Sequence, residues 1–298
     1  MDRLLITNVN GFLGAGLAAA LVDQFEVLGL GDQAPADARC RVVGPVAADS
    51  DLPAMVHESA PQWVIHCGSV ARSSWDWGPS TAAHDEADKL ASLAAAAGRL
   101  TVLSTDAVFT GPRLFHAEQS PVRDGDPLVG LVRDLETAAL EAGALVVRTH
   151  AYGWSATASD DGFAQRAWNA LEQGQPLRLS ADRHASPIFV DDLAELLLRA
   201  YRRNLRGLYH IAGGERTSQH QFAVELAVAC GFDPARIVPL RRESEGGTWT
   251  REETSLDSRR ARRALDAPLS LVREGLARFA RRQPNAHSVH PMPVRVAA

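Results

Sequence analysis

The sequence predicts an α/β protein with a Rossmann-like, doubly wound parallel sheet and a smaller C-terminal substrate lobe. The chain opens with an apolar run from Leu4, a glycine-bearing turn that ends at Gly14, and an Ala-rich run with helical spacing. Apolar strands and helices then alternate through the N-terminal half. This alternation is typical of a parallel sheet that is covered by helices on both faces.

The elements of the N-terminal half follow from their apolar patterns. We expect strands over residues 4–7, 26–30, 41–43, 63–67, 100–104 and 144–148, and helices over residues 52–59, 80–97 and 128–142. Binding sites in such sheets lie beyond the carboxyl ends of the strands. Attention therefore falls on residues 7–14, 31–32, 67–77, 105–109 and 149–154.

The pattern changes after Trp154, where the second lobe is expected to begin. We expect strands over residues 176–179 and 207–211, and helices over residues 162–172, 218–229 and 271–281. A strongly amphipathic helix through Tyr201 begins near Asp191 and Asp192, one of which is expected to be its N-cap and first-turn acid.

These elements predict the domain organisation. The Rossmann-like core is expected over residues 1–152 and is completed by about 186–203. The substrate-binding lobe is expected over residues 153–185 and 204–283, and a mobile Pro/His-rich tail over 284–298.

Composition excludes several classes of protein. The chain has 298 residues, 46% of them hydrophobic and 22% charged, with a net charge of −5. These values favour a globular protein without a surface for nucleic acid or anionic membrane. No run is long enough to span a bilayer, and no secretory signal opens the chain, so a cytoplasmic location is expected. The three cysteines are scattered, so neither a metal site nor a disulfide framework is predicted.

The strand, turn and helix at the start of the chain are typical of a dinucleotide-binding unit. In such a unit the turn brings backbone N–H groups and a helix N-terminus up to a pyrophosphate. The usual fingerprint has three glycines, and Asn8 replaces the first of them here. Asn tolerates a left-handed backbone, so the turn can form. The candidate cofactor-binding residues are Asn8, Asn10, Gly11, Phe12, Leu13, Gly14, Asp32, Cys67 and Gly68.

Several motifs resemble those of the extended short-chain dehydrogenase/reductases. The most specific are residues 104–111 (Ser-Thr-Asp-Ala-Val-Phe-Thr-Gly) and 186–193 (Ser-Pro-Ile-Phe-Val-Asp-Asp-Leu). The chain is most similar to the dTDP-4-dehydrorhamnose reductase group of nucleotide-sugar enzymes, from Leu4 to about Arg281. The resemblance implies a Rossmann fold, a bound NAD or NADP and a nucleotide-sugar ligand.

The catalytic pair that the resemblance implies is missing. Such enzymes carry Tyr-x-x-x-Lys on the helix after the fifth strand, where Tyr donates a proton and Lys lowers its pKa. The segment 127–136 contains neither residue. Lys89 is the only lysine of the chain, and Asp85 stands four positions before it. The sequence therefore lacks the residue pair on which the standard chemistry of the family depends.

Other residues are candidates for the acid/base role. His150 follows the sixth strand, and a neutral imidazole there, near Thr105 and Asp106, can serve as acid or base. The alternative is a histidine that is satisfied by the backbone of a loop. Asp32, just after the second strand, can reach a ribose hydroxyl and disfavours a 2′-phosphate, which slightly favours NAD over NADP. Its alternative is a solvated loop acid.

Candidate substrate contacts lie after the fourth and sixth strands and at the boundary of the second lobe. They are Trp75, Trp77, Tyr152, His184 and Ser186. The two tryptophans can stack on a substrate ring or form a small hydrophobic cover. Arg148 is expected to be buried and paired beneath the site. The arginine-rich segment 259–263 can meet a phosphate or form a solvated helical face.

Three functional hypotheses remain open at this point. The first is an enzyme that acts on a nucleotide sugar or another oxygenated metabolite with atypical acid/base chemistry. The second is a pseudoenzyme that binds a partner chain, since one family branch serves as a regulatory subunit. The third is a non-redox lyase or isomerase that uses the old pocket. A homodimer through the helices 80–97 and 128–142 is also plausible, because these helices pair in many relatives.

Overall fold

The computed structural model describes residues 1–31, 39–44, 52–76, 90, 93–95, 97–155, 161–241 and 253–282. Asp32, Trp77, the tail 284–298 and most of the expected helix 80–97 lie outside the described residues.

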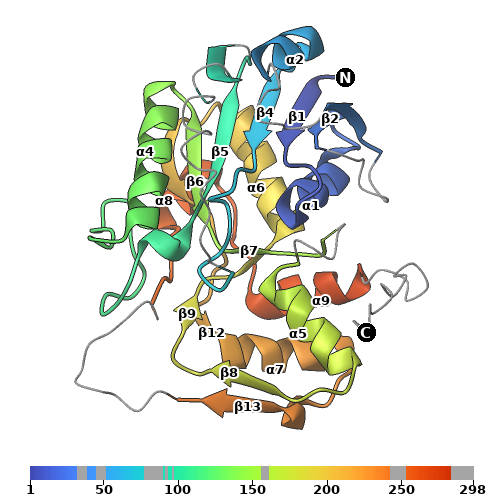
Figure 1. Cartoon of the computed structure of the whole chain (residues 1–298), viewed down its shortest axis with the longest axis vertical. Helices are drawn as coiled ribbons and strands as arrows, with labels where there is room; N and C mark the ends of the chain where they lie inside the picture. The colour runs from blue at the N-terminus through green and yellow to red at the C-terminus, as the bar shows by residue number, and fades with distance from the viewer. Residues whose placement is uncertain are drawn as a thin grey trace, which may run out of the picture.

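A seven-stranded parallel sheet forms the centre of the protein (Figure 1). Its strands, in spatial order, are β11 (Gly207–His210), β6 (Leu145–Thr149), β5 (Leu100–Thr105), β4 (Trp63–His66), β1 (Arg3–Thr7), β2 (Glu26–Leu30) and β3 (Arg41–Gly44). The chain starts in the middle of the sheet, builds one half, crosses over and builds the other half. The predicted doubly wound Rossmann-like fold is confirmed.

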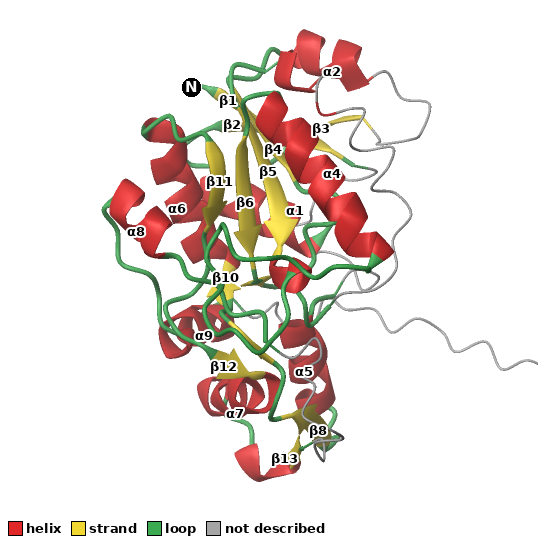
Figure 2. Cartoon of the chain, turned by 90° about the vertical axis from the view of Figure 1, so that its left-hand side faces the viewer, coloured by secondary structure: helices red, strands yellow, loops and turns green. Residues whose placement is uncertain are grey.

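Alternation along the strands divides the core into two layers. On β1, Leu4 and Ile6 belong to one apolar cluster, whereas Leu5 belongs to the cluster on the opposite face. The first cluster is covered by α1 (Phe12–Leu21) and α6 (Val190–Arg202), and the second by α4 (Pro127–Glu141) and α2 (Leu52–Ser59). Figure 2 shows α4 across one face of the sheet, with α1 and α6 on the other side.

The helices α1 and α6 approach each other closely because of a glycine. A Cβ atom at Gly16 would lie 2.7 Å from both Cγ atoms of Val190, the first residue of α6. This contact brings the C-terminal half of the chain back onto the dinucleotide-binding unit. No helix among the described residues has the length and apolar character needed to cross a membrane.

The second lobe lies beyond the carboxyl ends of the central strands (Figure 1). Its helices are α5 (Phe163–Glu172), α7 (Gln219–Cys230) and α9 (Val272–Arg281), and its short strand pairs are β8 (Leu177–Ser180) with β13 (Ile237–Leu240), β9 (His184–Ala185) with β12 (Thr217–Ser218), and β10 (Ile188–Phe189) with β7 (Ala151–Tyr152). The predicted boundary at residue 204 is wrong for two elements. The strand β11 pairs with β6 in the central sheet, and α8 (Arg259–Leu265) packs against β11 and α6.

The N-cap expected for α6 is also wrong. The helix begins directly after β10, so its N-cap is Phe189, which provides no side-chain hydrogen bond. Asp191 and Asp192 both lie in the first turn, so the expected first-turn acid is confirmed. Asp191 pairs with Arg282, directly after α9, and Asp192 pairs with Arg278 on α9. The carboxylates still stabilise the positive end of the helix.

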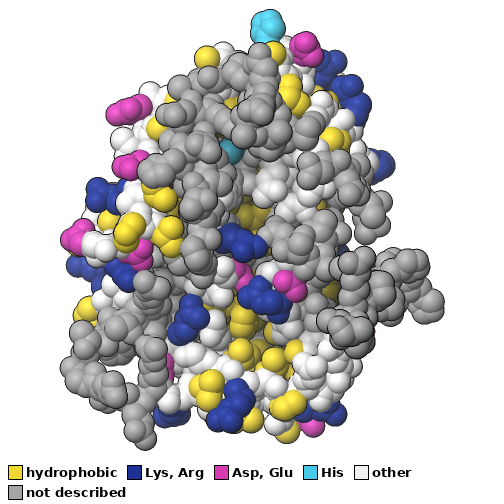
Figure 3. Space-filling view, viewed as in Figure 1, with side chains coloured by type: hydrophobic (Ala, Val, Ile, Leu, Met, Phe, Trp, Pro, Cys, Tyr) yellow, Lys and Arg dark blue, Asp and Glu magenta, His cyan; other side chains and the backbone are white. Residues whose placement is uncertain are grey.

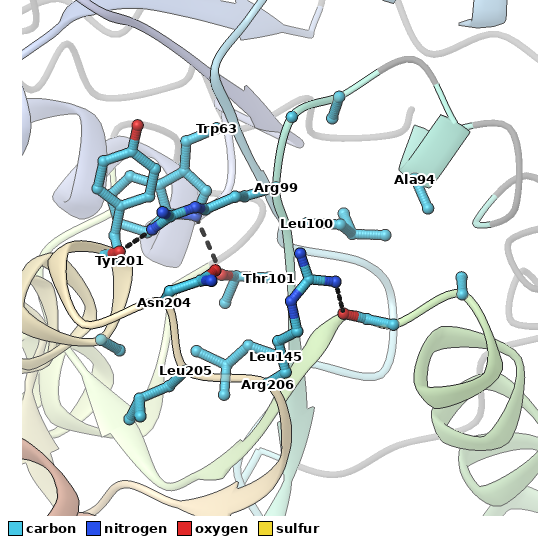
Figure 4. A pocket seen from close by; sticks show the side chains of 15 residues that line it. Trp63, Ala94, Arg99, Leu100, Thr101, Leu145, Tyr201, Asn204, Leu205 and Arg206 are labelled. Carbon is cyan, nitrogen blue, oxygen red and sulfur yellow. Dashed lines mark hydrogen bonds between the residues drawn. The ribbon is translucent and has the colours of Figure 1, made fainter.

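A cavity of about 50 Å³ lies at the amino edge of the sheet, where β4, β5 and β6 begin (Figure 4). Two of its lining residues are cations that already bond to helix ends. Arg99 donates to the Tyr201 carbonyl in the last turn of α6, and Arg206 donates to the Gly143 carbonyl after α4 (Figure 4). Because helix C-termini carry partial negative charge, these contacts stabilise both helices. The two arginines that line the cavity therefore have a structural role, which is to stabilise the ends of α6 and α4.

Two buried histidines hold the long loop after β5 against the sheet. The His116 ring stacks on Phe109 at 4.4 Å, and its backbone carbonyl lies 2.9 Å from Nδ1 of His210 on β11. His210 is fully buried, and burial, with Arg148 nearby, lowers its pKa to about 3. His210 is therefore neutral in the folded protein at neutral pH.

We predict that His210 contributes to acid sensitivity. Its pKa is about 3 when folded and about 6.5 when unfolded, so the unfolded state binds the extra proton between these values. Stability should therefore fall as the pH falls from about 6.5 toward 3, by up to about 1.4 kcal/mol per pH unit for this proton. Chemical denaturation of His210→Gln should show a shallower pH dependence. The exposed His57 provides a control, His57→Gln, and equal slopes for both variants would contradict the prediction.

Candidate functional site

The turn between β1 and α1 has a backbone that suits an anion. Asn8 adopts a left-handed conformation with φ of 50°, as its residue type allows, and its carbonyl accepts from the Gly11 amide at 3.1 Å. Gly11 is the N-cap of α1 and has no side chain with which to cap the helix. The first-turn amides of Phe12, Leu13 and Gly14 are therefore not capped by the N-cap residue, which is the arrangement that phosphate-binding helices use.

Two glycines let neighbouring segments approach this turn. A Cβ atom at Gly14 would lie 2.2 Å from the Asn8 carbonyl oxygen, so no other residue fits without movement of the backbone. A Cβ atom at Gly31, at the end of β2, would lie 2.1 Å from Oδ1 of Asn10. The turn therefore packs closely against α1, and the side chain of Asn10 lies against the end of β2. We call the turn at Asn8–Gly14 together with Gly31 the cradle, because side chains at Gly14 and Gly31 would occupy its space.

The end of β4 is fastened to the end of β1 beside this turn. The Thr7 hydroxyl accepts from the Cys67 amide at 3.0 Å and lies 3.0 Å from Nδ1 of His66. Burial raises the pKa of the Cys67 thiol strongly, so this sulfur is not a reactive thiolate. Gly68 accepts from the Ala71 amide at 3.1 Å in the turn that follows. The backbone of Cys67 is therefore tied to Thr7, the last residue before the turn.

Asp106 is the centre of a buried polar network at the ends of β5 and β6. Its Oδ1 accepts from the Ser74 amide at 2.8 Å, and its Oδ2 accepts from the hydroxyls of Ser74 at 2.7 Å and Thr254 at 2.6 Å. Nδ1 of His150 lies 2.7 Å from the same Oδ2. Asp106 is fully buried. Although burial opposes it, the charge and hydrogen bond of His150 and the two hydroxyls hold the pKa of Asp106 below its usual value.

His150 is oriented by Asp106 and covered by Trp75. With Nδ1 donating to the carboxylate, Nε2 is the remaining ring nitrogen, and it has no hydrogen-bond partner among the described residues. The Trp75 ring packs edge-on against the imidazole at 4.5 Å and also contacts Phe163 and Phe222. His150 is only 2% exposed. A carboxylate that orients an imidazole in this way can stabilise the protonated ring during proton transfer.

Thr105 does not present a free hydroxyl. Its Oγ1 donates to the Arg72 carbonyl at 2.5 Å and accepts from the Ala107 amide at 3.0 Å, and the residue is fully buried. The hydroxyl therefore acts as the cap of the short helix at Asp106–Val108. The expectation that it bonds a substrate carbonyl conflicts with these contacts.

The helix α4 carries no acid/base pair on its buried face. That face presents Val129, Val132 and Leu135, followed by Glu136. Glu136 receives a bidentate ion pair from Arg148 at 2.6 and 2.7 Å and a hydrogen bond from the Ser104 hydroxyl at 2.6 Å. Arg148 is thus buried and paired, as predicted. A fixed fork of this kind positions β6 against α4 but exchanges no proton.

Three further residues that were expected to contact substrate lie in different environments. Tyr152 is buried among Phe189, Phe222 and Phe279, so it belongs to the aromatic core. Ser186 is also fully buried, and its hydroxyl accepts from the Leu256 amide at 3.2 Å. These two placements conflict with substrate contact. His184 is half-buried, and burial, with Arg216 nearby, lowers the pKa of its imidazole.

Sequence reasoning missed the residues that complete the network. The hydroxyls of Ser74 and Thr254 both bond to Asp106, and their oxygen atoms lie 2.8 Å apart. Arg183 donates to the Ser74 carbonyl at 2.7 Å. The only available signal was the buried carboxylate itself, which requires donors. Near the same boundary, Arg166 of α5 pairs with Asp76 at 2.6 Å. Figure 3 shows charged side chains of both signs in the middle of the face that is turned to the viewer in Figure 1.

A family model described as the RmlD substrate binding domain matches residues 2–284 of the chain. Among curated proteins, the spore coat polysaccharide biosynthesis protein SpsK of Bacillus subtilis (strain 168) is 26% identical over 167 residues. The match covers 53% of this chain and 56% of that protein, so the chain spans about half the length of this relative.

Solved structures share the fold. A hypothetical dTDP-4-dehydrorhamnose reductase from Sulfolobus tokodaii superposes with a TM-score of 0.71 at 22% identity, covering 92% of this chain and 98% of that one. The dTDP-4-dehydrorhamnose reductase of Bacillus anthracis str. Ames in complex with NADP has a TM-score of 0.68 at 21% identity, with coverages of 93% and 98%. The dTDP-glucose 4,6-dehydratase of the same strain in complex with NAD has a TM-score of 0.75 at 13% identity, with coverages of 94% and 96%.

We predict that Asp106 stabilises the site more than any one of its hydroxyl partners does. Asp106→Asn removes the buried charge and turns an amide N–H toward existing donors, which should lower the free energy of unfolding by about 3 kcal/mol. Thr254→Val removes the hydroxyl that donates to Asp106 and also contacts the Ser74 hydroxyl and the His184 carbonyl, and it should cost about 1 to 2 kcal/mol. Urea denaturation at neutral pH measures both values. A loss for Asp106→Asn that does not exceed that for Thr254→Val would contradict this account.

Proposed function

The chain belongs to the RmlD substrate binding domain family, and on that premise we propose that it binds a nicotinamide dinucleotide and a nucleotide sugar or similar oxygenated metabolite. The observation that carries the proposal is the turn at Asn8–Gly14, with its left-handed first position, a helix start that receives no side-chain cap from Gly11, and the close approach at Gly14. The same features in a dinucleotide-binding unit accept a pyrophosphate.

The structural neighbours include complexes with each of the two nicotinamide dinucleotides. One structural neighbour was solved with NADP and another with NAD. We favour NAD because Asp32, directly after the Gly31 that packs against Asn10, would repel a 2′-phosphate.

We further propose that His150, held by Asp106, replaces the missing Tyr and Lys in acid/base chemistry. A bound reduced nicotinamide would supply a hydride to a substrate carbonyl. His150 would hold the proton for the resulting alkoxide at Nε2, and the Asp106 carboxylate 2.7 Å from Nδ1 would stabilise the charged ring. The role requires substrate to reach the imidazole, and Trp75 covers it. The same pair can serve a lyase or isomerase reaction that uses no nicotinamide.

A second candidate function is a ligand-binding pseudoenzyme that regulates a partner chain. Three observations favour it: the Thr105 hydroxyl is bonded to backbone, His150 is 2% exposed, and the buried face of α4 is apolar where the family places its catalytic pair. In this alternative the Asp106 network has a structural role and no catalytic one. Measured turnover separates the two functions.

We predict that dinucleotide binding depends on the charge at the α1 N-cap. Gly11→Asp places a carboxylate where the pyrophosphate is expected, while Asp remains a good N-cap. Its affinity for NADH and NADPH should fall about tenfold, which corresponds to about 1.4 kcal/mol. The matched variant Gly11→Asn has nearly the same shape without the charge and should bind more tightly than Gly11→Asp. Calorimetric titration measures the constants; failure of the natural chain to bind either cofactor at about 1 mM would refute the proposal.

We also predict that His150 is needed for turnover but not for cofactor binding. His150→Gln should lower kcat on a 4-keto nucleotide sugar, such as dTDP-4-dehydrorhamnose, by about a hundredfold or more. Its affinity for NADH should stay within about twofold, because the imidazole bonds to Asp106 and packs against Trp75 and makes no such contact with residues 8–14 of the turn. Oxidation of NADH followed at 340 nm measures the rate. An unchanged rate would exclude His150, and a natural chain that binds NADH without turning over nucleotide sugars would favour the pseudoenzyme.

A further inference from the structure

The arginine-rich helix α8 borders a groove that the proposed function does not use. The groove has a volume of about 640 Å³ and lies between α8 and the loop at Glu118–Gln119. The helix packs outside β11, the edge strand of the sheet (Figure 2). Three strands separate β11 from β1, where the dinucleotide turn begins. The groove is therefore a separate site.

Two of the arginines that line the groove have no ion-pair partner among the described residues. They are Arg260 and Arg263, which lie one helical turn apart. Residues spaced by three positions share a helix face, with Cβ atoms about 5 to 6 Å apart. The third lining arginine, Arg259, is neutralised by Asp257 through hydrogen bonds of 2.5 to 3.0 Å.

The ring of Tyr209 positions one of these arginines, and the lining carboxylate of Glu118 bonds to the backbone. The Arg260 guanidinium is held over the Tyr209 ring at 4.4 Å, which leaves the N–H groups at its edge available and limits the freedom it loses on binding. Glu118 faces the groove but uses Oε1 to accept from the His210 amide at 3.0 Å. Gln119 adds a neutral donor.

We propose that this groove is a second ligand site and that it binds the phosphate or diphosphate of a small molecule. Guanidinium groups match phosphate oxygens with paired N–H donors, and two of them one turn apart can hold adjacent phosphates. The volume exceeds that of a diphosphate and leaves space for the organic part of the ligand. A ligand in this groove would lie next to the loop after β5, which His116 and His210 hold against β11.

The test uses inorganic pyrophosphate as the probe and the full chain as the protein. Calorimetry should detect binding that weakens about tenfold in Arg260→Gln and in Arg263→Gln, because each loses a charged hydrogen-bond donor pair. Arg262→Gln is the matched control, since Arg262 is exposed on α8 but does not line the groove; its affinity should change by less than about twofold. Thermal unfolding verifies that each variant is folded.

A second arm separates this site from the dinucleotide turn. Gly11→Asp should retain the arginine-dependent binding of pyrophosphate, whether or not the chain binds NADH. The proposal is overturned if pyrophosphate does not bind at about 10 mM, if Arg262→Gln weakens binding as much as the other two, or if Gly11→Asp alone abolishes it. Triglutamate that binds more tightly than pyrophosphate through the same arginines would also overturn it, because the ligand would then be an acidic peptide.

Discussion

The buried carboxylate of Asp106 is the constraint on which the arrangement of the site depends. Removing a carboxylate from water costs several kcal/mol unless charged partners and hydrogen bonds replace the lost hydration. Asp106 obtains these partners from Ser74 after β4, from His150 after β6 and from Thr254, which lies far along the chain. One side chain thus fixes the relative positions of three strand ends and the second lobe.

The same network carries the atypical acid/base chemistry that we propose for this site. The helix α4 has an apolar buried face, and its one buried acid, Glu136, is paired with Arg148 beneath the sheet edge. At the end of β6, His150 combines an orientation fixed by the Asp106 carboxylate with a second ring nitrogen, Nε2, that has no hydrogen-bond partner among the described residues. The proton-transfer role that we propose therefore uses an imidazole whose charge is balanced by a carboxylate, in place of a phenol whose pKa is lowered by a lysine.

Local sequence signals predicted the fold well and the site only in part. Asn8 adopts a left-handed backbone because of its own residue type, and the strands follow from the apolar pattern of neighbouring residues. Such features depend on residues that are adjacent in the sequence. Thr254, in contrast, bonds to an Asp106 that is 148 positions away, and no local pattern indicates such a contact. The engagement of the Thr105 hydroxyl by the Arg72 carbonyl likewise depends on how a loop returns to the sheet. The N-cap of α6 was missed because β10 leads into the helix without an intervening loop.

The central claim is that the turn between β1 and α1 receives the pyrophosphate of a nicotinamide dinucleotide. Amide hydrogen exchange with and without about 1 mM NADH or NADPH tests it most directly, because a bound pyrophosphate bonds to the amides themselves. The account predicts slower exchange at Gly11–Gly14 with at least one of the two cofactors. Unchanged exchange across this turn with both cofactors, in a chain that is fully folded, would contradict it.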